Sequence, residues 1–312
     1  MAGAYAHLTV VNKAFTETEL EKLGFSKESL ISLGDYSTFT ELGSVSPDYP
    51  YLAIMEKHKK WADLMHVEMK TKSFILKGIE EVNAIKDEED KGRAFAWLCG
   101  LAGHIITDVV IHPVVELKVG TYEGHEAAHR NCEMHQDVYI YKKITGYGEI
   151  SENEQLSLFG KECSNNGDTD ELNKTISLVW GKMLEVLSKE EYLVNKPEFD
   201  TWHSRFHSLV STIEETQNFP TISRHVIGVN DGKIYPKFDE VDKKEFIENL
   251  KVPGNQTMHY DDIFNKVVSQ VQQTWKVLDE AVFGNDVTNL DYFADWNLDN
   301  GRTSSGKLEY WA

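Results

Sequence analysis

Apolar residues recur at helical spacing along most of the chain. Over residues 51–85 they stand three or four positions apart, and residues 151–194 repeat the pattern on both sides of a turn containing Asn and Gly. Such spacing places them on one face of an α-helix. The same pattern predicts helices over residues 199–216, 240–250 and 258–283. The sequence therefore predicts an all-α fold, a multi-helix bundle.

The central run, residues 94–112, is almost entirely apolar, which is typical of a helix buried on every side. Proline lacks a backbone N–H and clashes with the preceding turn, so Pro113 is expected to end or kink this helix. The run is long enough to be compared with a membrane span, but Asp108 and two histidines lie within it. A buried core helix fits better, and a second helix is expected over residues 125–143.

Two stretches lack the helical pattern. Residues 31–50 are rich in Gly, Ser and Pro and are predicted to form a loop. Asn-Asp-Gly between β-prone runs predicts a small β-hairpin near residues 222–238. No internal repeat or flexible linker divides the chain, so we predict a single domain over residues 1–312. Residues 1–150 carry most of the candidate ligands, and residues 151–312 are expected to complete the bundle and end in a tail.

Composition and charge narrow the function classes. The chain of 312 residues is 41% hydrophobic, which is enough for a substantial core. Its formal net charge of −19 argues against a protein that binds nucleic acid or anionic lipid through a basic surface. Three scattered cysteines predict free thiols. The N-terminus lacks the features of a secretory signal, so we expect a cytoplasmic protein, and no protein partner is evident from the sequence.

Candidate chemistry is concentrated in residues 101–137, where histidines and carboxylates recur every four positions. The first series is His104, Asp108 and His112, and the second is His125, His129, Glu133 and Asp137. A step of four advances a side chain by one helical turn and about 40°, so neighbours can bind one ion. The first and third members of a series point about 80° apart, which suits two adjacent ions better than one.

Three further candidates precede this stretch: His7 in an apolar segment, Asp48 between Pro47 and Pro50, and His66 in a predicted helix. Imidazoles and carboxylates together suit zinc and related divalent ions. A single histidine on an apolar face is more often a core residue, but burying this whole set without ions would be costly. Metal ions activate water and polarise a phosphoryl oxygen, so phosphoester hydrolysis is the chemistry that such a cluster serves best.

Five sequence segments carry these candidates: AYAHLTVVN, GSVSPDYPY, WADLMH, LAGHIITDVVIHP and HRNCE. In this order they resemble the histidine and aspartate motifs of the zinc-dependent phospholipase C and single-strand nuclease superfamily. The likeness covers residues 1–140 and is nearest to the N-terminal domain of glycosylphosphatidylinositol-specific phospholipase D and to bacterial members of the same phospholipase family. The resemblance implies a helical fold that binds two to three zinc ions; other divalent metals and iron also suit these ligands.

The resemblance also implies which residues share an ion. It assigns the first ion to Asp48, His66, His104 and Asp108, the second to Asp108 and His7, and the third to His112, His129 and Glu133. If Met1 is removed, the amine of Ala2 is expected to bind metal too, as in the nuclease branch. His125 competes with His129, and we prefer His129 because it pairs with Glu133 one turn on. Asp137 is turned about 80° from His129, which favours a structural role.

We predict a metal-dependent phosphodiester hydrolase of phospholipase C type, in which a metal-bridging hydroxide attacks a phosphoryl group and Asp48 serves as ligand and base. Its substrate would be a small-molecule phosphoester or a lipid head group. One alternative is a nuclease that acts on nucleotides or short single strands. Glu126-Ala-Ala-His129 suggests a second, a helical di-iron or dimanganese oxidoreductase, although the motif occurs once instead of twice. The third is a non-catalytic metal-binding protein.

Other conspicuous residues are predicted to be structural. His203 and His207 share a helix face without a carboxylate at the same spacing, so we interpret them as a packing pair. Cys132 has no evident base beside it and is interpreted as a packed thiol. The tail around Trp296 is expected to cover the mouth of the site without contacting the reacting groups.

Overall fold

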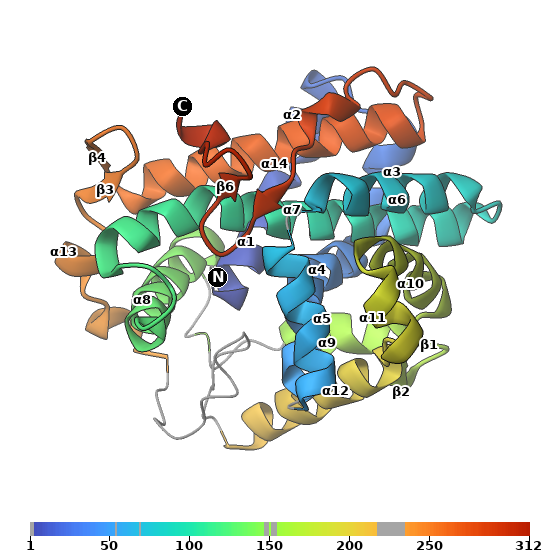
Figure 1. The fold of residues 1–312 in the computed structure, drawn as a ribbon, viewed down its shortest axis with the longest axis horizontal. Coiled ribbons are helices and arrows are strands. Elements are labelled where there is room, and N and C mark those ends of the chain that lie inside the picture. Colours follow the sequence, from blue (N-terminus) through green and yellow to red (C-terminus); the bar gives the residue numbers. More distant parts are fainter. Residues whose placement is uncertain (1–2, 54, 69, 147–149, 151–154, 217–234) are drawn as a thin grey trace.

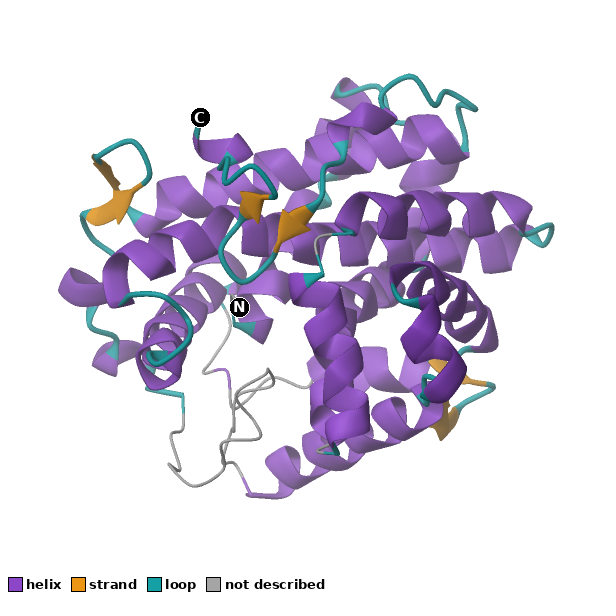
Figure 2. Ribbon diagram, viewed as in Figure 1, coloured by secondary structure: helices purple, strands orange, loops and turns teal. Residues whose placement is uncertain are grey.

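The computed structural model describes residues 3–53, 55–68, 70–146, 150, 155–216 and 235–312. Within these residues the protein is mainly helical, with three short pairs of antiparallel strands, and the predicted all-α class is confirmed (Figure 2). The α-helices are α1 (Ala4–Ala14), α2 (Glu17–Lys22), α3 (Lys27–Asp35), α4 (Ser37–Val45), α5 (Glu56–Val67), α6 (Thr71–Ala84), α7 (Glu88–Val119), α8 (Glu126–Thr145), α9 (Gln155–Glu162), α10 (Lys174–Leu187), α11 (Lys189–Val194), α12 (Phe199–Thr216), α13 (Lys243–Phe246) and α14 (Tyr260–Val282).

Helix α7 is the centre of the bundle and runs across the middle of Figure 1. The carboxylate of Asp87 accepts a hydrogen bond from the amide of Asp90 (3.0 Å), which satisfies one of the free N–H groups at the start of the helix. Side chains from Ala94 to Val115 are buried without interruption. The predicted core helix is therefore confirmed, but it extends past Pro113 to Val119 instead of ending there.

Helix α4 lies directly against α7, where the sequence predicted a loop over residues 31–50. A Cβ atom on Gly43 would lie 2.1 Å from the carbonyl oxygen of Trp97, and one on Gly100 would lie 2.0 Å from that of Thr40. The two backbones are in contact, so the small residues here serve close packing and not loop flexibility. The 3₁₀ helix η1 (Ser46–Ala53) follows and carries Asp48 towards α7.

Helix α14 packs on another side of α7, where the indole of Trp275 donates a hydrogen bond to the carbonyl of Cys99 (2.7 Å). With both neighbours in place, α7 is enclosed. It is the one helix among the described residues that is long and apolar enough to cross a membrane, and its whole apolar window is buried inside the protein.

The short strands form three hairpins: β1 (Ser164–Asn165) with β2 (Asp168–Leu172), β3 (Leu250–Val252) with β4 (Gln256–Met258), and β5 (Trp296–Asn297) with β6 (Arg302–Thr303). The pair β3–β4 replaces the end of the helix predicted over 240–250, because Gly254 and Asn255 adopt positive φ and reverse the chain. The hairpin predicted near 222–238 falls mostly on residues 217–234, which lie outside the described residues.

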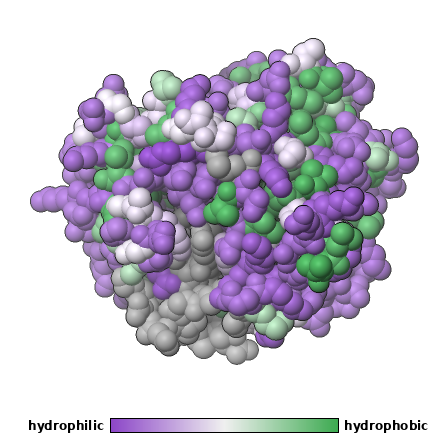
Figure 3. All heavy atoms as spheres, viewed as in Figure 1, coloured by the Kyte–Doolittle hydropathy of each residue, from purple (hydrophilic) through white to green (hydrophobic). Residues whose placement is uncertain are grey.

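The face of the molecule in Figure 3 is mainly hydrophilic, in keeping with the large negative charge, and apolar groups are scattered over it. Among the described large apolar side chains, Val194 at the end of α11 and Leu178 on α10 are the most exposed, at 83% and 70%. Isolated exposed apolar residues are normal on a folded protein. The buried histidines and carboxylates are the unusual feature of this structure.

Candidate metal centre

Four elements bring six of the predicted residues together in the interior. Helix α7 supplies His104, Asp108 and His112 on successive turns, α1 supplies His7, η1 supplies Asp48 and α5 supplies His66. None of the six is more than 1% exposed. Two overlapping groups have ligand atoms within 4.8 Å of one another: His7 with His104 and Asp108, and Asp48 with His66 and His104.

Asp108 lies between the imidazoles, and its two oxygens face different partners. Oδ1 is 3.3 Å from Nε2 of His7 and 3.2 Å from Nε2 of His112. Oδ2 is 3.2 Å from Nε2 of His104 and 3.9 Å from Nε2 of His66. Asp48 adds a second carboxylate, with Oδ1 3.5 Å from Nε2 of His66. One carboxylate that serves two sides in this way has the arrangement of a bridging ligand.

Backbone carbonyls fix the orientation of three of the rings. Nδ1 of His66 donates to the carbonyl of Ala62 (2.7 Å), and Nδ1 of His104 donates to that of Ser44 (2.8 Å). Nδ1 of His112 donates to the carbonyl of Leu298. In a neutral imidazole the proton is then on Nδ1, so Nε2 presents a lone pair. Each Nε2 points at a carboxylate oxygen, which is also an acceptor.

Two acceptors at this separation repel one another unless a cation lies between them. Zinc binds nitrogen and oxygen at about 2.0–2.2 Å, so adjacent ligand atoms of a tetrahedral site lie roughly 3.3 Å apart. The contacts of His7, His104 and His112 with Asp108, 3.2–3.3 Å, match this edge length. Among the described residues, Nε2 of each of these rings has no hydrogen-bond partner of good geometry. The residues present therefore fit a divalent ion.

His129 and Glu133 form a neighbouring pair on α8. Nε2 of His129 donates to the carbonyl of Gly120 (2.7 Å), which leaves Nδ1 facing Oε1 of Glu133 at 3.9 Å. The ring is thus held in the opposite tautomer from those on α7. Burial lowers the pKa of His112, while Asp108 and Glu133 raise it, so the pair on α8 acts electrostatically on the cluster.

A family model for zinc-dependent phospholipase C matches residues 6–190 of the chain. The chain belongs to the zinc-dependent phospholipase C family. The matched region contains all eight of the predicted protein ligands, and the resemblance drawn from the sequence motifs is confirmed. Searches among curated proteins and among solved structures gave no match.

Most of the imidazoles in the cluster favour the neutral form. Burial, aided by the stacked ring of His104, lowers the pKa of His7 to about 4. Burial also lowers the pKa of His66. For His104 burial acts in the same direction, but the carboxylates of Asp108 and Asp48 outweigh it and raise its pKa. Neutral imidazole is the form that binds metal.

The marginal candidates lie outside the two ligand groups. His125 is exposed at the start of α8, and its Nδ1 donates to the carbonyl of Thr121 (2.9 Å). Asp137 is buried, but its carboxylate accepts hydrogen bonds from the amide of Ala6 (2.8 Å) and the hydroxyl of Tyr235 (2.7 Å). It therefore supports the start of α1, the helix that carries His7. Met1 and Ala2, and with them the expected amine ligand, lie outside the described residues.

The other residues that the sequence analysis interpreted as structural, His203, His207 and Cys132, pack against other protein groups. Nε2 of His203 lies 3.0 Å from Oγ of Ser164, and the rings of His203 and His207 are in edge contact. Cys132 is fully buried, and burial raises the pKa of its thiol. The carboxylate of Glu126 is at the surface and accepts from the amide of Gly124 (3.0 Å), so Glu126 and His129 do not converge as a di-iron motif requires.

The tail was predicted to avoid the chemistry, and that expectation is wrong. The carbonyl of Leu298 accepts the Nδ1 proton of His112, which makes the backbone of the tail a direct support of a candidate ligand. A leucine carbonyl carries no signal in the sequence. The structure shows that this segment packs on the core, because the side chain of Trp296 is fully buried.

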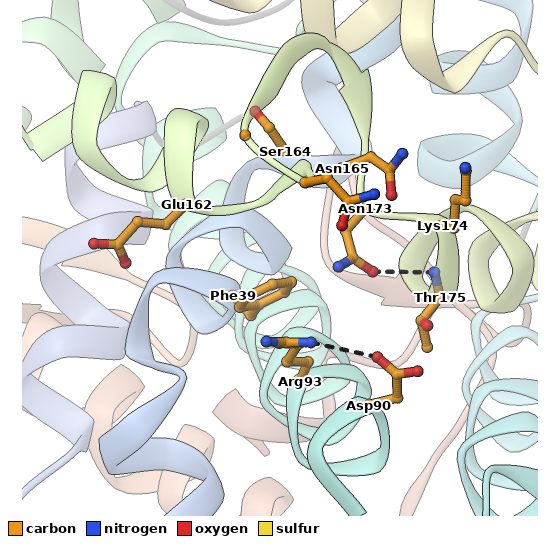
Figure 4. Close-up of a pocket in the computed structure, with 11 residues that line it drawn as sticks. Phe39, Asp90, Arg93, Glu162, Ser164, Asn165, Asn173, Lys174 and Thr175 are labelled. Carbon is orange, nitrogen blue, oxygen red and sulfur yellow. Dashed lines mark hydrogen bonds and ion pairs between the residues drawn. The ribbon is translucent and has the colours of Figure 1, made fainter. Parts of the chain in front are cut away.

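A separate polar hollow of about 380 Å³ lies between α4, α7 and the start of α10 (Figure 4). Arg93 in its wall is paired with Asp90 (3.5 Å), and the side chain of Asn173 caps its own helix through the amide of Thr175 (3.0 Å). These groups already satisfy one another, so this hollow does not share the chemistry of the cluster.

Proposed function

We propose that this chain hydrolyses phosphodiesters with zinc, in the manner of a phospholipase C, and that its substrate is a phospholipid or a related head-group ester. The observation that carries the proposal is the set of bare imidazole nitrogens that face the carboxylates of Asp48 and Asp108 in a fully buried cluster. Such a cluster needs cations to offset acceptor–acceptor repulsion. Membership of a zinc-dependent family makes zinc the cation of choice.

The geometry supports one division of the ligands among three ions. Asp108 has separate imidazoles at each oxygen, which supports a bridge between the first ion and the second. The full proposed set is Asp48, His66, His104 and Asp108 for the first ion, Asp108 and His7 for the second, and His112, His129 and Glu133 for the third. Bound zinc supplies Lewis acidity, which makes water more acidic and polarises a phosphoryl oxygen.

Asp48 is proposed to accept the proton of the attacking water. It is buried, it sits in the short helix η1 between two prolines, and its Oδ1 faces His66. Proline restricts the backbone on either side, so the carboxylate is held in position before substrate arrives. As water adds to phosphorus, its proton passes to Asp48, the P–O bond to the leaving alcohol breaks, and the alcohol oxygen takes up the proton that Asp48 received.

Metal content and a substrate panel test this proposal together. We expect the purified wild-type protein to contain two to three equivalents of zinc by elemental analysis. It should cleave a phosphocholine ester or phosphatidylinositol faster than single-stranded DNA, because the net charge of −19 repels a polyanionic strand. Faster cleavage of DNA would reassign the protein to the nuclease branch, and iron with a visible chromophore would rule out both hydrolase assignments.

Variants of single ligands test the site itself. His104→Ala and Asp108→Asn each remove a group from the centre of the cluster, so both should lose zinc and lower kcat/KM by at least about 1,000-fold. His125→Ala is the matched control, because His125 is an exposed histidine bonded to Thr121 and should retain zinc and activity. Full zinc content in both His104→Ala and Asp108→Asn would mean that the site has been misplaced.

A further inference from the structure

Residues 294–303, here called the C-terminal strap, cross α7 beside the cluster of candidate metal ligands (Figure 1). The carbonyl of Leu298 accepts the Nδ1 proton of His112 on α7. The amide of the same residue donates to the backbone carbonyl of His66 on α5 (2.7 Å). A single residue of the strap therefore joins the two helices that hold opposite sides of the cluster.

The strap is anchored at both ends. At its start, the hydroxyl of Thr71 donates to the carbonyl of Ala294 (2.8 Å) and accepts from the amide of Trp296 (2.8 Å), whose side chain is fully buried. At its other end, Arg302 forms an ion pair with Glu116 on the last turns of α7 (2.6 Å). Residues 297–301, which lie between these contacts, have little freedom to move away from His112.

Pro113 leaves a backbone carbonyl of α7 without a helical donor at the place where the strap lies. Because proline has no N–H, the carbonyl of Val109, four residues earlier, loses its helical donor. Gly301 fits against this carbonyl so closely that a Cβ atom would lie 2.4 Å from the oxygen, and its φ of +70° is one that glycine adopts readily. The next carbonyl, that of Val110, accepts a hydrogen bond from the indole of Trp311 (3.0 Å).

We propose that the C-terminal strap is a positioning element of the metal centre, in which the Leu298 carbonyl holds the His112 ring so that Nε2 faces Asp108. The inference rests on the proposed function, since it concerns the same cluster. Groups that orient a metal ligand from behind set its tautomer and basicity, and their loss typically weakens metal binding about 10- to 100-fold. Because linkage is reciprocal, bound zinc should in turn hold the strap in place.

The two glycines with positive φ in this region allow a matched test. Gly301→Ala places a methyl group against the carbonyl of Val109, whereas Gly306→Ala changes a glycine of φ +79° with nothing within 4 Å of the added Cβ. Both variants carry the same backbone strain, but only Gly301→Ala displaces the strap. We expect the zinc Kd, measured by chelator competition, to rise about 10- to 100-fold in Gly301→Ala and to stay within about twofold of wild type in Gly306→Ala.

Hydrogen exchange of the wild-type protein gives a readout that does not depend on a variant folding. With zinc bound, the amide of Leu298 should exchange more slowly than in the chelated protein, and amides on α10, which carries none of the candidate ligands, should change less. The proposed role of the strap, but not the proposed function, would be contradicted by either of two results: unchanged exchange at Leu298 when zinc binds the wild-type protein, or a wild-type zinc Kd in Gly301→Ala. Wild-type protein that binds no zinc would overturn the proposed function as well.

Discussion

Asp108 shows how one buried carboxylate can organise several imidazoles. Burial would raise the pKa of Asp108, but His112, His104 and His7 together lower it well below its usual value. The side chain therefore stays ionised in an interior where an isolated charge would be very unfavourable. The one negative charge of Asp108 faces four imidazoles, so the cluster contains more acceptor atoms than hydrogen-bond donors. Bound cations would compensate for this excess of acceptors.

The pH dependence of zinc binding should reveal which ring binds a proton first. The pKa of His104 is raised, whereas burial lowers the pKa of His7, His66 and His112. A proton therefore competes with zinc at His104 at a higher pH than at the other three rings. We expect the zinc Kd to rise about tenfold per pH unit once the pH is below the raised pKa of His104, while the other three rings are still neutral. A rise of about a thousandfold per unit, from three rings titrating together, would contradict this assignment.

At the residue scale, the sequence predicts side chains well and backbone partners poorly. The four-residue spacing singled out His104, Asp108 and His112 because their side chains have a distinctive chemistry. The carbonyls of Ser44 and Leu298, which orient two of these rings, come from residue types that carry no such signal. Any residue can supply a carbonyl, so only the fold reveals these contacts.

Helix α1 shows how an element can be placed by a group from another helix. The first N–H groups of a helix have no partner within it, and here Asp137 of α8 accepts from Tyr5 (3.3 Å) and Ala6 (2.8 Å). Its carboxylate also accepts from the hydroxyl of Tyr235. Because α1 carries His7, Asp137 acts on the cluster through the position of a helix. This agrees with the structural role expected from its position about 80° from His129 on the helix.

The unfolding free energies of Asp137→Asn and Asp137→Ala should differ, and their difference from wild type should depend on pH. Burial raises the pKa of Asp137 to about 7, above the unfolded value of about 3.9, so the carboxylate lowers stability as the pH rises between these values. Asp137→Asn keeps an acceptor and cannot ionise, so its unfolding free energy should rise relative to wild type between about pH 5 and pH 8. Asp137→Ala leaves the amides unpaired and should cost about 2–4 kcal/mol throughout.

Urea denaturation at about pH 5 and about pH 8 measures the unfolding free energies of the two variants and of wild type. Equal losses for Asp137→Asn and Asp137→Ala at the higher pH would show that the hydrogen bonds to α1 do not depend on an acceptor at this position.

At the scale of elements, the errors of prediction have a common cause. Residues 31–50 looked like a loop because Gly, Ser and Pro are common in loops, yet Gly43 is small because α4 touches α7. Pro113 was expected to end or kink its helix; α7 does not end there, and Gly301 packs against the carbonyl of Val109 that proline leaves without a helical donor. Tertiary contacts decided both cases, and local sequence does not contain them.

The whole molecule should depend on its metal for stability, since the buried imidazoles and carboxylates otherwise oppose one another. Each zinc ion present at about 1,000 times its Kd adds about 4 kcal/mol to the folded state. We therefore expect Tm to fall when EDTA removes zinc and to rise steadily with free zinc concentration. His125→Ala should follow wild type in this titration, and His104→Ala should respond less. Identical Tm values with zinc and with EDTA would contradict a buried metal centre.

The spacing of apolar residues predicted the fold class, and the five motifs in residues 1–140 predicted the family and six residues that meet in the interior, because histidine and aspartate side chains have a distinctive chemistry. The contribution of residues 191–312 could not be predicted in this way. They lie beyond the family match and act through packing, backbone hydrogen bonds and ion pairs such as Arg302–Glu116.

The reach of the cluster along the chain has a consequence for how the protein matures. Its groups extend from His7 to Leu298, so they leave the ribosome at very different times. At about 5–20 residues per second, the carbonyl that orients His112 emerges roughly ten seconds or more after the histidine itself. Until then the nascent chain holds imidazoles without their final orientation. We therefore expect zinc to bind in the native geometry only after the segment around Leu298 has emerged and packed against His112.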